Sequence, residues 1–402
     1  MKKTIDRSNE NRSLGDLGPM LTRVGGIVAA IGILATLAIA FTSDHGTERF
    51  FKSYTTNFAY FLSLSLGGIF FVVIQHLTSA TWSVVVRRIA EAIAANMLLL
   101  LGLFIPIAFG MDIIYHHWTD PHAASDPVLA AKLGYLNKPF FLIRWGLYFL
   151  IWVVLSRFFH GQSVKQDTTG DIDHTLRMQK WSAPAIVLFA LTTTFAAFDL
   201  IMSLNPHWYS TILGVYYFAG CALSAFALIA MSSMWLQAKG RITESVTTEH
   251  YHDLGKLCFA FTIFWAYIGF SQFMLIWYAN IPEETEWYLH RITGSWLPFS
   301  WGILIAHFVV PFLFFISRIP KRSRAFFRFG AVYILIIHWC DMYWVTMPEW
   351  YTDGIHFNLM DITLFLAMGG LFLVGMARRL GKASLVPEKD PRLEGSLAFE
   401  NY

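Results

Sequence analysis

The chain contains ten apolar segments, and each is about as long as the roughly 20 residues that a helix needs to cross a bilayer. A segment in lipid must satisfy its own backbone hydrogen bonds, so segments of this length predict helices. We therefore expect an all-α integral membrane protein with about ten transmembrane helices. The expected spans, whose ends are set to within several residues, are 21–41, 55–79, 92–111, 139–158, 183–204, 211–236, 256–279, 296–317, 327–347 and 358–379.

The composition agrees with a membrane protein and argues against several functional classes. Hydrophobic residues make up 55% of the 402 residues and charged residues only 14%, whereas a soluble domain has about 25% charged residues. Cys221, Cys258 and Cys340 are isolated, and no CxxC or CxxCH spacing is present, which argues against an iron–sulfur cluster or a covalent haem on this chain. The net charge of +3 gives no reason to expect a nucleic-acid partner.

The positive residues are divided unequally between the two sides of the expected spans. Most of the 30 Lys and Arg residues lie in the two tails and in the loops that share their side. Loops rich in Lys and Arg stay in the cytoplasm. We therefore expect a bacterial inner-membrane protein with both termini in the cytoplasm. The loops of the opposite side hold Arg49, Lys52, Lys132, Lys138 and Arg291.

The pattern divides the chain into a cytoplasmic N-terminal tail (1–20), a ten-helix transmembrane domain (21–380) and a cytoplasmic C-terminal tail (381–402). The C-terminal tail has mixed charge and two prolines, so we expect it to be extended. Two outer loops, 112–138 and 280–295, are too short to be domains. They are either docking surfaces for a partner or ordered connections.

Ionisable residues within the expected spans are the candidate functional residues. Each costs on the order of 3 kcal/mol at the centre of a membrane helix, so each calls for a partner or a watery cavity. Their functional interpretation is proton transfer, and their structural interpretation is pairing between helices. The candidates are Asp112, Arg144, Asp199, His338, Asp341 and Asp361 in the outer half of their spans, His76 and Glu91 toward the cytoplasm, and His307 between them.

Two pairs of these residues have both a functional and a structural interpretation. His338 and Asp341 are three residues apart, so they share a helix face and are able to hydrogen-bond. A carboxylate beside an imidazole is able to bind and release a proton, and the alternative is a helix–helix clamp without proton transfer. Asp199 either exchanges protons with the outer side or forms a structural ion pair with Arg144.

The candidates of the cytoplasmic half favour structural interpretations. Glu91 follows Arg87 and Arg88 at ion-pair spacing on a helix, and its other interpretation is the mouth of a proton path. His76 by itself is typical of an interfacial histidine. Because we expect His76, His307 and His338 to lie at different depths, bis-histidine ligation of haem is disfavoured, and we expect no metal ion or haem bound within this chain.

Four sequence blocks carry a resemblance to a known family. They are GGIFFVVIQHLTSATWSVVVRRIAE, FDLIMSLNPHWYSTILGVYYFAG, HWCDMYWVTMPEW and LVPEKDPRLEGSLAFEN. Together the blocks resemble the NrfD-like, or polysulfide-reductase membrane-subunit, family. The likeness runs over nearly the whole chain and is greatest to the shorter of the two such subunits in bacterial alternative complex III.

The resemblance implies eight core helices in two four-helix bundles, with peripheral helices added. It also implies a membrane subunit of a respiratory quinol:electron-acceptor oxidoreductase, in which quinol or menaquinol is oxidised near the outer side. The implied partners are an iron–sulfur subunit, c-type haem subunits and a second NrfD-like subunit, within membrane lipid, and no cofactor is bound covalently to this chain. The residues implied to take up protons are Asp199, His338, Asp341 and Asp112, although the longer sibling subunit is the better candidate for the working quinol site.

Two other functional classes remain open from the sequence. A secondary transporter or ion channel would use the buried acids and histidines as a translocation site near the bilayer midplane. Pro106 and Pro311 lie within or near spans, but they do not form the matched pair of helix breaks expected of inverted repeats. A structural anchor for peripheral subunits would need none of the intramembrane acids for turnover.

Overall fold

The computed structural model describes residues 7–401, and it confirms an all-α membrane protein. The described residues contain no strand, and ten of their helical spans are long and apolar enough to cross a membrane. All ten expected spans are found. They are α1 (Leu17–Thr42), α2 (Gly46–Leu77), α3 with α4 (Val84–Ala94, Met97–Phe109), α8 (Lys138–Thr169), α9 with η2 (Asp173–Leu200, Met202–Leu204), α10 (Leu213–Ala238), α11 (Thr248–Ala279), α13 with η3 and α14 (Trp296–Ile303, Leu304–Val309, Val310–Ile316), α16 with η4 (Arg324–Thr346, Met347–Glu349) and α17 (Leu359–Leu380).

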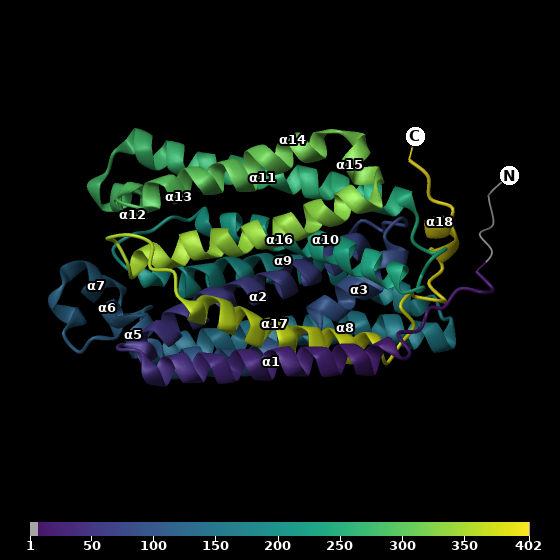
Figure 1. Ribbon diagram of the computed structural model, residues 1–402, viewed down its shortest axis with the longest axis horizontal. Helices are drawn as coiled ribbons and strands as arrows, with labels where there is room; N and C mark the ends of the chain where they lie inside the picture. The colour runs from purple at the N-terminus through teal and green to yellow at the C-terminus, as the bar shows by residue number, and fades with distance from the viewer. Residues whose placement is uncertain (1–6, 402) are drawn as a thin grey trace.

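The remaining helices are short and lie at the two ends of the spans. Both described chain ends lie at one end, together with α15 and α18, and we call this the tail end (Figure 1). The opposite end, which we call the loop end, carries α5, α6, α7 and α12. The short elements are α5 (Met111–Ile114), α6 (His116–Thr119), η1 (Ala123–Ser125), α7 (Pro127–Lys132), α12 (Pro282–Ile292), α15 (Arg318–Arg322) and α18 (Leu393–Leu397).

The spans form two groups of four with two helices outside them. The first bundle contains α2, α3–α4, α8 and α9, and the second contains α10, α11, α13–η3–α14 and α16. Helices α2 and α10 pack against each other and join the bundles, and 89% of the most apolar window of each is buried. Helices α1 and α17 lie side by side at the periphery (Figure 1). The arrangement agrees with the two bundles that the resemblance implies.

Glycines allow the closest helix contacts. A Cβ added to Gly67 on α2 would lie 1.9 Å from the carbonyl oxygen of Cys221 on α10. A Cβ added to Gly370 on α17 would lie 2.5 Å from the carbonyl oxygen of Gly25 on α1. Because any larger side chain would push these backbones apart, glycine sets the spacing of both helix pairs.

Two segments expected to be loops are helical, so three basic residues assigned to loops lie in helices. Helix α2 begins at Gly46 rather than near residue 55, so Arg49 and Lys52 lie in its first turns and are buried. Arg291 lies in α12 and is fully buried. Each of the three has an acidic partner: Asp361 for Arg49, Glu48 for Lys52 and Glu349 for Arg291. A hydropathy window ends a span at its first charges and therefore misses helix turns that carry neutralised charges.

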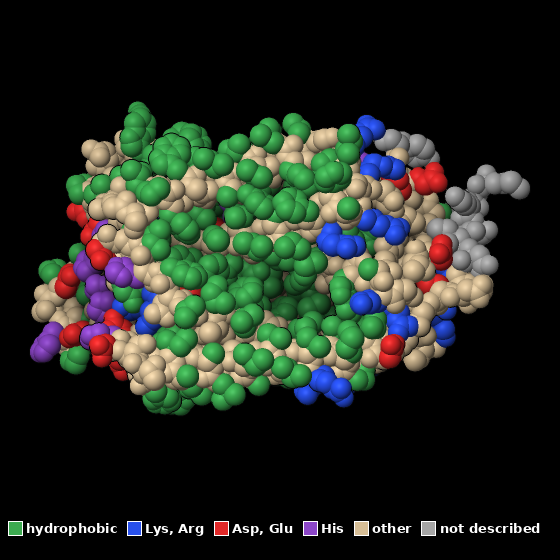
Figure 2. All heavy atoms as spheres, in the orientation of Figure 1, with side chains coloured by type: hydrophobic (Ala, Val, Ile, Leu, Met, Phe, Trp, Pro, Cys, Tyr) green, Lys and Arg blue, Asp and Glu red, His purple; other side chains and the backbone are tan. Residues whose placement is uncertain are grey.

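The surface divides into three zones along the long axis. Figure 2 shows a broad hydrophobic band between the two ends, with Lys and Arg gathered toward the tail end, His gathered toward the loop end, and Asp and Glu at both ends. The C-terminal tail is extended apart from α18, as expected. Residues 1–6 and 402 of the two expected tails lie outside the described residues.

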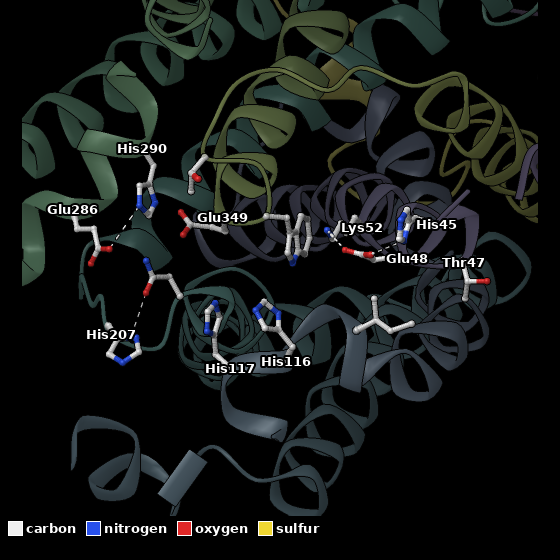
Figure 3. Close-up of a pocket in the computed structure, with 14 residues that line it drawn as sticks. His45, Thr47, Glu48, Lys52, His116, His117, His207, Glu286, His290 and Glu349 are labelled. Carbon is white, nitrogen blue, oxygen red and sulfur yellow. Dashed lines mark hydrogen bonds and ion pairs between the residues drawn. The ribbon is translucent and has the colours of Figure 1, made fainter. Parts of the chain in front are cut away.

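The loop end is hollowed by an open cavity of about 810 Å³. The 112–138 loop, the start of α2, α12 and η4 surround it (Figure 3). Its lining is polar and rich in histidine. The lining histidines and charged residues are His45, His116, His117, His207, His290, Glu48, Glu286, Glu349 and Lys52.

Candidate functional site

A cluster of two histidines and one aspartate lies inside the second bundle. It consists of His307 on η3 and His338 and Asp341 on α16, and one ligand-type atom of each lies within 4.8 Å of the others. His338 and Asp341 are fully buried, and His307 is 2% exposed. We call these three residues the HHD cluster. It brings together three of the residues that the sequence marks as candidates.

A local change of helix geometry places His307 in the bundle. Residues Leu304–Val309 form a π-helical segment between α13 and α14, and Pro311 follows in the first turn of α14. Proline has no N–H, so Pro311 is unable to donate the helical hydrogen bond to the carbonyl of His307 four residues earlier, and its ring crowds that carbonyl. The wider π geometry relieves this crowding, and such segments are frequent at functional sites.

Asp341 is held by hydrogen bonds from neutral groups and not by a cation. The hydroxyl of Tyr216 on α10 donates to Oδ1, and the indole N–H of Trp265 on α11 donates to Oδ2 over 3.2 Å. His307 Nε2 and His338 Nδ1 each lie 4.0 Å from Oδ2. No Lys or Arg forms an ion pair with Asp341 in the part of the chain that the structure describes. Only a proton or a protonated imidazole is therefore at hand to neutralise this carboxylate.

The two imidazoles are positioned by packing and keep unused nitrogens. His338 Nε2 lies 2.8 Å from the hydroxyl of Ser63 on α2, and the ring occupies the space left by Gly220 on α10. His307 stacks on Trp265 with ring centroids 4.0 Å apart. Both nitrogens of His307 and Nδ1 of His338 are buried without a hydrogen-bond partner in the described residues. Buried polar atoms of this kind are rare in folded proteins and call for an explanation.

The arrangement suits a proton better than a metal ion or a haem. A tetrahedral Zn²⁺ with bonds of about 2.1 Å brings its ligand atoms to about 3.4 Å from one another, so the 4.0 Å spacings would have to contract. One carboxylate also leaves a dication undercompensated in an apolar interior. The rings of His307 and His338 have centroids 6.3 Å apart, so these two histidines are near neighbours. The Asp341 carboxylate nevertheless lies close to both rings, where a porphyrin bound between them would need space.

Asp199 and Arg144 form a second buried site, in the first bundle. Arg144 Nε and Nη2 donate to the two carboxylate oxygens of Asp199, each over 2.8 Å, and the hydroxyl of Tyr148 donates over 3.0 Å. The guanidinium carbon lies 3.7 Å from the ring centroid of Tyr135. Of the two interpretations left open by the sequence, the ion pair is therefore present.

Asp361 and Asp112 do not join the HHD cluster. Asp361 accepts from Arg49 over 2.5 Å and from Ser53 over 2.7 Å, and its carboxylate also caps the start of α17 by accepting from the Asn358 N–H. Asp112 lies in α5, beyond the end of its span, and its side chain is 67% exposed beside Lys138. The placement of Asp112 within a span was wrong, because the helix of that span ends at Phe109.

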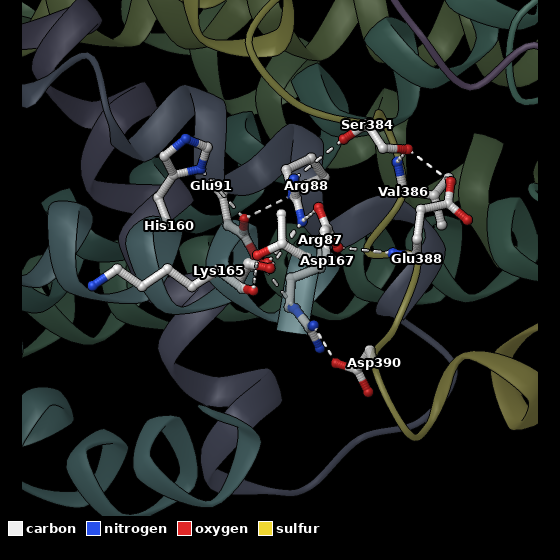
Figure 4. A network of polar contacts seen from close by, with 12 residues as sticks. Arg87, Arg88, Glu91, His160, Lys165, Asp167, Ser384, Val386, Glu388 and Asp390 are labelled. Atoms are coloured by element: carbon white, nitrogen blue, oxygen red, sulfur yellow. Dashed lines mark hydrogen bonds and ion pairs between the residues drawn. The ribbon is translucent and has the colours of Figure 1, made fainter. Parts of the chain in front are cut away.

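The candidates near the tail end belong to a separate polar network (Figure 4). Glu91 lies 3.5 Å from Arg87 Nε and 3.1 Å from Arg88 Nε, as its spacing on α3 predicts. Arg87 also pairs with Asp390 of the C-terminal tail over 2.5 Å. His76 is fully buried and stacks on the ring of Phe159, with centroids 5.5 Å apart. This network fastens the tail to the helix ends and lies apart from the HHD cluster.

Several residues that complete the buried sites were not identified from the sequence. Tyr216, Trp265 and Ser63 hold the HHD cluster, but a single Tyr, Trp or Ser in an apolar helix has no distinctive spacing. Arg291 and Glu349 form a buried pair at 2.8 Å that two segments far apart in the chain bring together. The helical period is a sequence signal for Glu349, because Asp341, Val345 and Glu349 are spaced four residues apart and fall on one face. In the structure Arg291 also donates to the Val345 carbonyl on that face.

The chain was compared with models of known protein families and with curated proteins. No family model matches the chain, and no curated protein matches it at a significant level.

Proposed function

We propose that this chain is a membrane subunit of a quinol:electron-acceptor oxidoreductase of the alternative-complex-III type. In this proposal it supports quinol binding and oxidation and transfers protons, while iron–sulfur and c-type haem centres on partner subunits carry the electrons. The observation that supports the proposal most is the HHD cluster, a fully buried carboxylate and two imidazoles without a counter-cation. The resemblance to NrfD-like subunits supplies the reaction class.

The chemistry of quinol oxidation explains why such a cluster would be useful. Oxidation of one quinol to a quinone releases two electrons and two protons. In the proposal the electrons pass to a metal centre of a partner subunit, and the protons need nearby acceptors. Asp341 and the unpartnered nitrogens of His307 and His338 are acceptors of this kind. Tyr216 holds the carboxylate in place while its protonation changes.

The proposed membrane and orientation rest on the charges at the two ends. Lys and Arg side chains gather toward the tail end, whereas histidines gather toward the loop end (Figure 2). Positive residues are retained on the cytoplasmic side of a bacterial inner membrane. We therefore infer that the tail end faces the cytoplasm and that the loop end faces the periplasm, where the partner subunits would dock.

The proposal is tested in the complex purified from its native membrane. A tagged chain is isolated in mild detergent, the co-purifying subunits are identified, and quinol-dependent cytochrome reduction is measured. Asp341→Asn is expected to lower the turnover rate about 10²-fold, the scale of one general acid–base group, with the partner subunits still recovered. Asp112→Asn, which alters an exposed carboxylate at the loop end, is the matched control and is expected to leave turnover unchanged.

Two results would overturn the proposal. The first is a fully assembled complex in which Asp341→Asn and His338→Gln both oxidise quinol at the wild-type rate, which an anchoring role would produce. The second is a chain that purifies without redox partners and catalyses solute uptake in vesicles, which would establish a transporter.

A further inference from the structure

The cavity at the loop end has a lining suited to a cation. Three carboxylates, Glu48, Glu286 and Glu349, face one ammonium group, that of Lys52, among the residues that line it. Figure 3 shows the histidines distributed around the cavity between the acidic residues. Lys52 pairs with Glu48 and the buried Arg291 pairs with Glu349, so with neutral imidazoles the charge left over is that of Glu286. The cavity is open, so ions reach it from the solution without crossing the hydrophobic band.

Two adjacent histidines offer free imidazole nitrogens at this cavity. His116 and His117 on α6 have ring centroids 3.9 Å apart, and neither ring makes a hydrogen bond within the described part of the chain. Partial burial, together with the charges of His116 and His207, lowers the pKa of His117 to about 4. Burial and the charge of Lys52 also lower the pKa of His116. The neutral imidazole is the form that binds a metal ion, and the partial burial of both rings favours it.

A third histidine is oriented as metal-bound histidines commonly are. His207 Nε2 lies 2.6 Å from Asp126 Oδ2, and a carboxylate on one ring nitrogen fixes the tautomer and leaves the other nitrogen for a metal. The rings of His117 and His207 have centroids 6.4 Å apart. Two imidazoles that share an ion through bonds of about 2.1 Å have centroids roughly 5 to 6 Å apart, so the two rings have to move closer by about 0.4 to 1.4 Å on binding.

We propose that His117 and His207, beside His116, bind a divalent transition-metal ion of the Zn²⁺ class at the loop-end cavity. Imidazole ligands select zinc, copper and nickel rather than magnesium or calcium. The Asp126 carboxylate acts through His207 as a positioning group. This site differs from the expectation that the chain binds no metal, because His207 lies far along the chain from the other two histidines and only the folded 112–138 loop brings them together.

The site is tested by metal binding alone, independently of the proposed function. The full chain is purified in mild detergent with a tag that contains no histidine. Zn²⁺ affinity is then measured by competition with a chromophoric chelator, and Co²⁺ serves as a probe whose visible absorption reports its ligands. The double variant H117N/H207N is expected to bind Zn²⁺ at least tenfold more weakly than the wild type. Asp126→Asn is expected to weaken binding by about 10- to 100-fold through the orientation of His207.

The control is a histidine at the same end that does not line this cavity. His356 is exposed and lies 2.9 Å from Asp353, so His356→Asn changes an equivalent imidazole–carboxylate pair and is expected to leave Zn²⁺ affinity unchanged. The proposal fails if the wild type binds no Zn²⁺ at about 100 µM, where a site of micromolar affinity would be filled. It fails equally if H117N/H207N and Asp126→Asn both bind as tightly as the wild type.

Discussion

One buried carboxylate of each bundle, Asp199 in the first and Asp341 in the second, invites comparison because the two have opposite surroundings. Asp199 in the first bundle receives two hydrogen bonds from Arg144 and one from Tyr148, so its charge and its acceptor sites are satisfied. Asp341 in the second bundle receives hydrogen bonds only from Tyr216 and Trp265, and its nearest basic groups are imidazoles 4.0 Å away.

The difference separates a structural charge from a candidate for chemistry. An ion pair with bidentate geometry holds the protonation of both partners fixed, because protonating the carboxylate would leave the guanidinium uncompensated. A buried carboxylate beside neutral imidazoles has several protonation states in which the cluster carries little net charge. Burial and residue type alone do not distinguish the two sites. The distinction lies in which hydrogen-bonding atoms are left unused, and those atoms belong to His307 and His338.

Removing the cation of the first site is expected to have the largest effect on stability. Arg144→Met would leave the Asp199 carboxylate buried without its counter-ion, at a cost of about 3–5 kcal/mol in the free energy of unfolding. Asp341→Asn is expected to cost about 1–3 kcal/mol, because the amide oxygen still accepts from Tyr216 and no cation is orphaned, but the Trp265 indole N–H loses its acceptor. Denaturant unfolding in mild detergent measures both variants.

The double variant R144M/D199L sharpens this comparison. If the first site is purely structural, replacing both charges with apolar side chains restores most of the stability lost in Arg144→Met. A double variant as unstable as the single one would mean that the first bundle needs the charges themselves. An Asp341→Asn variant as unstable as Arg144→Met would remove the contrast between the bundles.

A smaller effect is expected from filling the space beside His338. A Cβ at Gly220 would lie 2.7 Å from His338 Cε1, so Gly220→Ala must displace the ring from its contact with Ser63. We expect a loss of about 1–3 kcal/mol in unfolding free energy, the usual cost of overpacking, and slower quinol oxidation. The control is Gly146→Ala on α8, where the added methyl meets no atom within 4 Å and removing a helix glycine is expected to stabilise by about 0.5–1 kcal/mol. Equal responses of the two variants would show that the position of His338 is not constrained.

The sequence predicts the helices of this protein better than it predicts the contacts between them. Hydrophobic runs determine the ten spans, because the bilayer sets their length and leaves the backbone no alternative to helix. Spacing along one helix likewise predicts that Glu91 pairs with Arg87 and Arg88 and that His338 and Asp341 share a face. Neither kind of pattern identifies a partner on another helix.

The contacts that define the buried sites join segments far apart in the chain. The pair of Arg49 with Asp361 and the convergence of His307 on Asp341 both depend on which helices are neighbours. Asp112 was misplaced because the helix of its span ends at Phe109, and the π-helical segment that places His307 beside His338 was not expected. Neither the end of α4 nor the π-helical segment can be predicted from composition.

The smallest effect is expected from Asp112, the one candidate carboxylate that the structure places on the surface. Its ion pair with Lys138 joins two exposed side chains, 67% and 44% accessible, and exposed pairs contribute from nothing to about 1 kcal/mol. Asp112→Asn is therefore expected to change the unfolding free energy by no more than about 0.5 kcal/mol and to leave quinol oxidation intact. Unfolding in detergent and turnover of the assembled complex measure these two quantities. A loss of turnover as large as that expected for Asp341→Asn would mean that the chemistry lies at the loop end, and the contrast between the two bundles would then describe packing rather than function.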